Sequence, residues 1–409
     1  MASIHKFDMT SPSFKDNPFP TLAKMRAAGP VIRAKIPILG KIWLVTSYAA
    51  VDEMLRDHQR FVRDARNAGQ NKFTDWQWWL SRLFRSAADN MLSKDEPDHR
   101  RLRSLVDEAF LRRSVESMHD RVQTLADEIL DETISKSHDP RRIDFLEFAR
   151  QFPLAVICEL LGFSGEDRAK FTYWARGIST VSSLAGFLML LPNMFRIGRH
   201  FRRQFQLCRE QPREGLISLL VQVEEAGDSL SESELQAMAF LLLFAGHETT
   251  THLLATGLLS LQDHPDEKAA LTTDWTLAQT AVEEMLRYNS PVQFTKPRIA
   301  SEDLGFHGQK IGRGDYLIAM LASANSDPAR FTDPERFDIR RSPNPHLSFG
   351  TGIHVCLGAK LARMEAEIAF ERLFTRYPNL QLAVERKDIS WSTRIGLRAL
   401  QSLPLRLGT

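Results

Sequence analysis

The stretch Pro345–Gly358, PHLSFGTGIHVCLG, is the most informative segment of this 409-residue chain. It places Cys356 directly before a segment with a helical pattern. Backbone N–H groups at a helix N-terminus stabilise a thiolate, and Gly352 and Gly358 permit the close approach by which amides can point at the sulfur. The alternative is a glycine-rich turn in which Cys356 is a small buried apolar residue. Taken by itself, the pattern leaves both interpretations open.

The same stretch resembles the heme-binding signature of the cytochrome P-450 family. The matching residues are Phe349, Gly352, His354, Cys356 and Gly358. The family more often has arginine at the position of His354, where histidine is a familiar bacterial variant. The resemblance implies that Cys356 is the axial ligand of the heme iron, that Phe349 packs against its sulfur and that His354 meets a heme propionate. An electron-donating thiolate favours O–O cleavage.

One helix of unusual length is predicted. Ser231-Glu232-Ser233-Glu234 has the pattern of a capping box, and the helical run that it opens continues to about Asp263, before His264-Pro265. From Met238 to Phe244 nearly every side is apolar. A helix that is apolar all round belongs in the middle of a large core.

This helix contains Ala245-Gly246-His247-Glu248-Thr249-Thr250-Thr251. Thr249 can donate to the carbonyl of Ala245, and glycine weakens the same turn, so we expect a local opening there; a simple bend is the alternative. A zinc protease is excluded because His252 follows His247 by five residues, about 140° round the helix. The segment resembles the oxygen-activation motif of the P-450 family, which implies that Glu248 and Thr249 are its catalytic acid–alcohol pair.

Charged residues elsewhere are similar to further family motifs. Glu284 and Arg287 match a Glu-x-x-Arg pair, which the resemblance completes with Arg336 as a structural triad. His99, Arg103 and Arg298 match residues that bind the heme propionates. Arginine suits this role because it forms bidentate bonds with carboxylates. For each of these residues taken separately, the alternative is an ordinary solvent-exposed charge.

Composition excludes several classes of protein. Fifty-three basic and 51 acidic residues give a net charge of +2, so no nucleic-acid partner is indicated. Three distant cysteines fit a reducing compartment. The N-terminus lacks the apolar core of a signal peptide, and the longest apolar stretch, 181–195, is shorter than the roughly 18–20 residues that a spanning helix needs. We expect a cytoplasmic protein without a transmembrane segment, although whether 181–195 touches a membrane stays open.

The expected fold is mainly α with a smaller β region, in the cytochrome P-450 arrangement of a long central helix crossing over a buried heme. We expect residues 1–409 to form a single domain. Its β-rich part should lie mostly in 1–65 and 292–409, with strands such as Ile42–Thr46 and Tyr316–Ala319, and its helical part mostly in 97–288.

The resemblance implies a heme b monooxygenase that hydroxylates or epoxidises an apolar small molecule. No nucleotide-binding fingerprint is present, so electrons from NAD(P)H would arrive through a ferredoxin or flavodoxin-type donor and its reductase. A peroxide-driven peroxygenase and a non-catalytic heme sensor are the alternatives. Two sets of residues bear on partners. Apolar candidates for substrate contact are Trp76, Trp78, Trp79, Phe187, Leu188, Leu190 and Met194. A basic docking face for the donor could be supplied by Arg100, Arg101, Arg103, Lys360 and Arg363.

Overall fold

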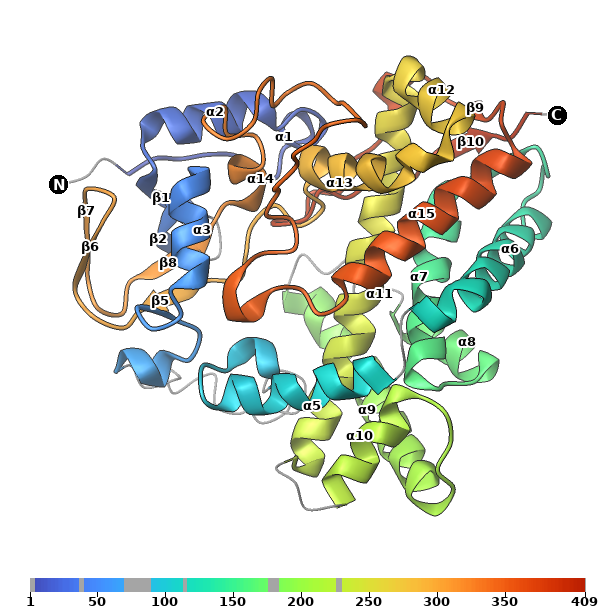
Figure 1. Cartoon of the computed structure of the whole chain (residues 1–409), viewed down its shortest axis with the longest axis horizontal. Coiled ribbons are helices and arrows are strands. Elements are labelled where there is room, and N and C mark those ends of the chain that lie inside the picture. Colours follow the sequence, from blue (N-terminus) through green and yellow to red (C-terminus); the bar gives the residue numbers. More distant parts are fainter. Residues whose placement is uncertain are drawn as a thin grey trace. The chain divides into compact units, whose positions relative to one another are not determined.

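The computed structural model of the chain describes residues 4–36, 40–69, 90–112, 116–175, 184–225 and 230–408. Most of these residues are helical (Figure 1). The helices are α1 (Pro12–Asp16), α2 (Phe19–Ala28), α3 (Tyr48–Arg56), α5 (Asp98–Arg112), α6 (His119–Ser135), α7 (Phe145–Leu161), α8 (Gly165–Ala175), α9 (Leu184–Glu210), α10 (Leu216–Glu225), α11 (Glu232–Asp263), α12 (Pro265–Thr273), α13 (Ala278–Asn289), α14 (Leu321–Ala324) and α15 (Ala359–Arg376).

The strands are short. They are β1 (Val31–Ile36), β2 (Gly40–Val45), β3 (Phe61–Val62), β4 (Arg142–Asp144), β5 (Arg298–Ala300), β6 (Leu304–Phe306), β7 (Gln309–Ile311), β8 (Tyr316–Ala319), β9 (Gln381–Leu382) and β10 (Pro404–Arg406). The predicted strands at 42–46 and 316–319 are confirmed by β2 and β8. One strand, β4, lies inside the range predicted to be helical, where it pairs with β10.

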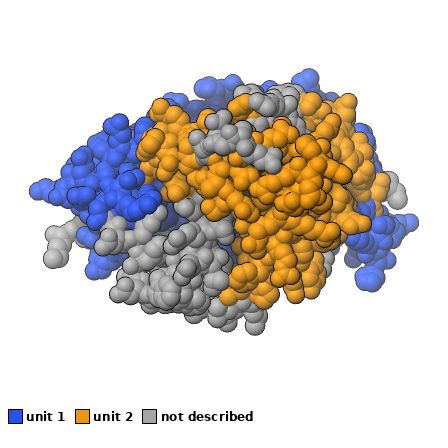
Figure 2. Space-filling view, turned by 90° about the horizontal axis from the view of Figure 1, so that it is seen from below, with its two compact units in different colours: residues 1–72, 132–146, 252–409 blue, residues 73–131, 147–251 orange. Residues whose placement is uncertain are grey.

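The chain divides into two compact units, which Figure 2 distinguishes by colour. Unit 1 comprises 1–72, 132–146 and 252–409, and unit 2 comprises 73–131 and 147–251. Unit 1 contains all the strands named above and the cysteine loop. Unit 2 contains α5, α7 to α10 and the first part of α11.

The largest sheet, in unit 1, has the strand order β1-β2-β8-β5-β3. β1 and β2 are antiparallel with Val31 opposite Val45, and β2 is parallel to β8. Because successive side chains of a strand point to opposite faces, β1 contributes to two hydrophobic clusters. Val31 packs with Trp43 and Leu317 on one face, whereas Ile32 and Ala34 pack with α2 on the other.

Helix α11 is the longest helix of the described ranges, at 32 residues. The predicted capping box is confirmed, since Ser231 N donates to Glu234 Oε2 at 2.9 Å and Glu234 N donates to Ser231 Oγ at 3.3 Å. The expected local opening is not seen, because residues 232–263 form one continuous helix. The threonine hydroxyls bond to carbonyls four residues earlier without interrupting it. None of the helices in the described ranges has the length and apolarity needed to cross a bilayer.

Candidate functional site

The loop before α15 is held in a tight conformation that depends on glycine. Cys356 N donates to Phe349 O at 2.9 Å, and Gly350 N donates to Leu347 O at 2.8 Å. The φ angles of Gly350 and Gly352 are 68° and 72°, a region that L-residues rarely adopt. At Gly352 a Cβ atom would lie 2.4 Å from the carbonyl oxygen of Leu55. Glycine is therefore required at position 352 by both conformation and space.

The loop presents a thiol and an apolar side chain side by side. Cys356 is exposed, and the neighbouring Val355 is one of the few large apolar side chains that are exposed, at 41%. Cys158 and Cys208, in contrast, are buried, and burial raises the pKa of the Cys158 thiol. An accessible thiol in an apolar surface near the start of a helix suits an axial sulfur ligand of a heme iron. The chemistry of the loop therefore fits this group.

Behind the loop, charged side chains of α13 and α15 form a compact cluster. Arg363 Nη2 donates to Glu283 Oε2 at 3.0 Å, and His346 Nε2 lies 3.1 Å from the same oxygen. Burial alone would raise the pKa of Glu283, but the hydrogen bonds from His346 and Arg363 outweigh it and lower this pKa to about 2. The guanidinium of Arg363 lies over the ring of Phe349. This cluster was not predicted from the sequence, because its members are distant along the chain.

The middle of α11 has an accessible strip, in a segment (residues 244–249) that is more exposed than the parts of the helix directly before and after it. Leu242, Leu243 and Thr250 are buried, whereas Ala245 is exposed and Glu248 and Thr249 are half-buried. Residues 245, 248 and 249 share one face of the helix. The strip thus presents a carboxylate and a hydroxyl together, and the Thr249 hydroxyl donates to Ala245 O at 2.9 Å, as the sequence predicted.

His247, in the same turn, is half-buried. Its Nδ1 lies 2.8 Å from Leu243 O. Burial lowers the pKa of this imidazole, against the opposing effects of that hydrogen bond and of Glu248. A neutral His247 donates through Nδ1 to the helix backbone. The His247 side chain is therefore bonded to the backbone of its own helix.

The residues predicted to bind propionates lie in both units. In unit 2, His99 is 3% exposed, burial lowers its pKa, and Arg103 Nε donates to Asp107 at 3.0 Å. In unit 1, Arg298 is 1% exposed and donates to Phe61 O at 3.0 Å. It also donates to Leu55 O at 3.3 Å, and a guanidinium is a group that can bind a carboxylate in bidentate fashion. His354 is half-buried in the cysteine loop.

The charged triad has a different third member from the one that the resemblance implied. Arg287 and Glu284 form a bidentate pair with both distances 2.7 Å, and both side chains are 0% exposed. The second guanidinium on Glu284 is that of Arg341, whose Nε lies 3.2 Å from both carboxylate oxygens. Arg336 instead accepts a bond from Arg287 through its backbone carbonyl, at 3.1 Å, and its side chain is exposed.

Most of the basic residues predicted to form a docking face have acidic partners. The pairs are Arg100 with Glu96, Arg101 with Glu234, Arg103 with Asp107 and Arg363 with Glu283. The cationic face is therefore weaker than the sequence indicated. The predicted substrate contacts Trp76, Trp78 and Trp79 lie outside the described residues. So do the side chains of Phe187, Leu188 and Leu190, whereas Met194 is half-buried on α9.

Comparisons with known proteins agree with this chemistry. The family model for cytochrome P450 matches residues 196–397. The chain is 40% identical to the polyketide biosynthesis cytochrome P450 PksS of Bacillus subtilis, over 96% of each protein. It is also 40% identical to the cytochrome P450 monooxygenase PikC of Streptomyces venezuelae, over 96% of this chain and 92% of the relative.

Solved structures give the same result. The myxobacterial cytochrome P450 CYP267B1, solved with myristic acid, superposes with a TM-score of 0.89 at 39% identity and covers 98% of this chain and 99% of its own. The expected fold is thereby confirmed. With a relative at this identity over nearly its whole length, the chain belongs to the cytochrome P450 family of heme b monooxygenases.

Proposed function

We propose that this protein inserts one atom of O2 into an apolar small molecule, with Cys356 as the axial ligand of its heme iron. The observation that carries this proposal is the exposed thiol of Cys356 in a glycine-dependent loop next to exposed Val355. Neither of the other two cysteines, both buried, offers such a surface. Heme b, when bound, supplies the binding and reductive activation of O2.

The loop residues would act on the sulfur. The backbone of Phe349 fixes the Cys356 amide at 2.9 Å, so the cysteine is held in one orientation at the start of α15. The helix N-terminus and nearby amides favour the thiolate over the thiol. Arg298, His99, Arg103 and His354 are proposed to neutralise the two propionates, because unpaired carboxylates in an apolar site are costly.

On α11, Thr249 and Glu248 are proposed to deliver protons to the site of oxygen reduction. The Thr249 hydroxyl donates to Ala245 O, so the lone pairs of its Oγ1 remain available to accept a hydrogen bond from a water or from a protonated oxygen. Glu248, on the same accessible strip, can pass protons to that position. A peroxide-driven reaction would need this proton supply less, because peroxide brings its own protons.

Redox partner, substrate and location belong to the proposal as well. We infer a ferredoxin or flavodoxin-type donor with its NAD(P)H-dependent reductase, since the chain carries no nucleotide-binding fingerprint. The polyketide-pathway name of PksS and the myristic acid bound to CYP267B1 support an apolar, medium-sized substrate. The three scattered cysteines support a cytoplasmic location.

The ligand assignment is tested by spectroscopy. The reduced protein under carbon monoxide should show the strongly red-shifted band of a thiolate-bound heme. Cys356→His should lose this band, whereas Cys158→Ser and Cys208→Ser should keep it. A normal band from Cys356→His would refute the assignment. Binding of substrate candidates can be followed in the same protein by shifts of the heme absorption.

A further inference from the structure

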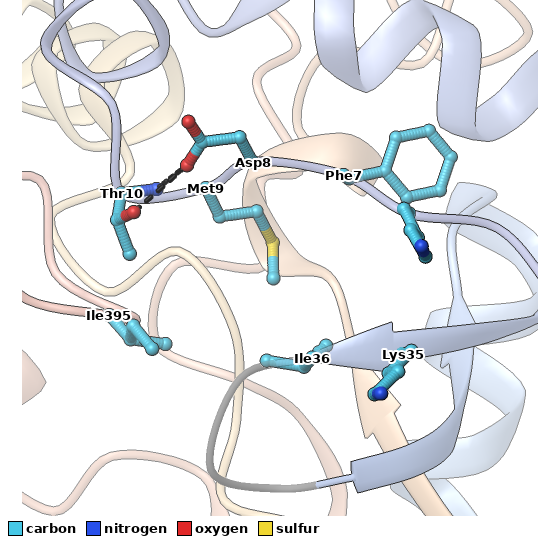
Figure 3. A pocket seen from close by; sticks show the side chains of 8 residues that line it. Phe7, Asp8, Met9, Thr10, Lys35, Ile36 and Ile395 are labelled. Carbon is cyan, nitrogen blue, oxygen red and sulfur yellow. Dashed lines mark hydrogen bonds between the residues drawn. The ribbon is translucent and has the colours of Figure 1, made fainter.

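A pocket of about 490 Å³ lies in unit 1, where the N-terminal segment meets the end of β1. Figure 3 shows most of its lining residues, which are Lys6, Phe7, Asp8, Met9, Thr10, Lys35, Ile36 and Ile395. Its volume falls in the range of small-molecule sites, about 300–1,000 Å³. No part of the proposed oxygen chemistry uses these residues.

One wall of the pocket is apolar and comes from three separate segments. Met9 and Ile36 are 3% and 2% exposed and belong to one hydrophobic cluster, against which Phe7 packs. In Figure 3, the side chains of Met9, Ile36 and Ile395 extend toward the same space. Such a wall suits a hydrocarbon chain.

The rest of the lining carries three charged side chains, those of Lys6, Lys35 and Asp8. His5 N donates to Arg33 O at 2.9 Å and Lys35 N donates to His5 O at 3.0 Å, so the N-terminal segment runs parallel to β1 with His5 beside Ala34. Continuing this register places Lys6 beside Lys35. In the β1–β2 hairpin Lys35 lies directly opposite Lys41.

Lys6, Lys35 and Lys41 therefore form a row of exposed lysines across three neighbouring chain segments. Side chains opposite one another across strands have Cβ atoms about 4.5–5.5 Å apart, and like charges there are destabilising. Among the described residues, none of the three ammonium groups has an acidic partner within ion-pair distance. A row of this kind is an arrangement that an anion would stabilise.

The nearby carboxylates are committed elsewhere. Asp8 Oδ1 accepts from Thr10 N and Thr10 Oγ1, both at 2.9 Å, and from Ser11 N at 3.0 Å. These bonds lower the pKa of Asp8. Asp315 accepts from Trp43 Nε1 at 2.9 Å and from Gly312 N at 3.0 Å. Both carboxylates serve local turns. Asp8 stays ionised, so Lys6 and Lys35 contribute two positive charges to the pocket lining against one negative charge.

We propose that this pocket binds a single-chain aliphatic carboxylate. The carboxylate lies at Lys6 and Lys35, with Lys41 adding to the positive potential. The hydrocarbon chain lies along Met9, Ile36 and Ile395. Each part of the ligand is matched by one side of the pocket, and neither a neutral lipid nor a purely ionic compound would use both.

Decanoate is the probe for this proposal, added to the heme-loaded protein labelled at its methionine methyl groups. The Met9 signal, identified by its loss in Met9→Leu, reports this pocket, and the heme absorption reports binding near the iron. Decanoate should shift the Met9 signal saturably, and more weakly at high salt because exposed charges are screened. Decanol and decyltrimethylammonium should bind far more weakly.

Charge reversal supplies the matched variants. The double variant Lys6→Glu/Lys35→Glu should weaken the Met9 response to decanoate about tenfold. Lys24→Glu, which reverses an exposed lysine of α2, should leave the response unchanged. If decanoate shifts the heme absorption while the Met9 signal stays fixed, carboxylates bind only near the iron and the proposal is wrong. Equal affinity for decanol and decanoate would also overturn it, because the lysines would then not be recognising the head group.

Discussion

The guanidinium carbon of Arg363 lies 4.5 Å from the centre of the Phe349 ring. Phe349 in turn accepts the backbone bond of Cys356 N. Arg363 is itself anchored by Glu283 of α13, and these bonds, more than any other influence, raise its pKa. The position of the thiol is thereby connected to the packing of α13 against α15.

Arg363→Leu should loosen this arrangement. The substitution removes a cation from the face of Phe349 and leaves Glu283 half-buried with one partner fewer. We expect the free energy of unfolding to fall by about 1–2 kcal/mol, and the carbon monoxide band of the reduced protein to be lost more rapidly on warming. Arg363→Lys is the matched control, because it keeps the charge but not the planar stacking. Its free energy of unfolding and the persistence of its carbon monoxide band should lie between those of the parent protein and Arg363→Leu. An unchanged band in Arg363→Leu would show that the loop holds the sulfur without this contact.

The two candidates for the third member of the triad can be separated by stability. Arg341 is 11% exposed and contacts a fully buried carboxylate, so Arg341→Ala should cost about 2 kcal/mol in urea unfolding. Arg336→Ala removes an exposed side chain but keeps the carbonyl that Arg287 uses, so its effect should be within about 0.5 kcal/mol. If Arg341→Ala and Arg336→Ala lower the free energy of unfolding equally, both side chains stabilise the charge of Glu284.

The difference between these two arginines shows what the sequence could predict. Local patterns gave the right answer where the interaction is local. The capping box of α11 and the bond from Thr249 to Ala245 each join residues three or four positions apart. The Glu284–Arg287 pair is of the same kind. Arg341, and not the predicted Arg336, contacts Glu284 because of how the loop after Pro334 folds back on α13. No local sequence pattern specifies this.

The same limit applies to the cysteine loop. The residue pattern made Gly352 and Cys356 candidates, because a turn before a helix is a local structure, and the family resemblance added Phe349. The pattern could not supply the reason for Gly352, which is the carbonyl of Leu55 almost 300 positions earlier in the chain. The helix opening was predicted from weak helix formers, but the backbone of α11 is continuous through these residues, and the threonine hydroxyls donate to carbonyls four residues earlier without breaking it.

A buried lysine should make stability depend on pH. Lys15 is fully buried, with Nζ donating to Gln293 Oε1 at 2.7 Å. Burial, with a smaller contribution from the charge of Arg398, lowers its pKa from 10.5 to about 7. Between these two values the unfolded chain binds the proton and the folded protein releases it. Stability should therefore rise with pH across this window, by at most about 1.4 kcal/mol per pH unit.

Urea unfolding at pH 7, 8 and 9 measures this slope. Lys15→Met keeps the length of the side chain and removes the titrating group, so the rise should flatten. Lys24→Met, at an exposed position, should keep the slope of the parent protein. If Lys15→Met and the parent show the same slope, Lys15 stays charged in the folded protein.

The mechanism proposed for α11 is tested by measuring how much product is formed for each NADPH consumed. Thr249→Val removes the hydroxyl while keeping the shape of the side chain. Substrate binding and electron delivery do not use this hydroxyl, so both should be nearly unchanged. Protons would be less well directed, and product formed per NADPH should fall to roughly a tenth or less, with hydrogen peroxide released in its place.

Thr250→Val provides the control, because it removes a neighbouring hydroxyl that is only 3% exposed and donates to Gly246 O. This variant should stay coupled. Glu248→Gln should differ from both, since it impairs proton supply and so slows turnover as a whole. Full coupling in Thr249→Val would assign the hydroxyl to helix geometry alone, through its bond to Ala245. Uncoupling in both threonine variants would point instead to a general loosening of α11. Only loss of coupling confined to Thr249 places a proton-directing group on the accessible strip of the helix.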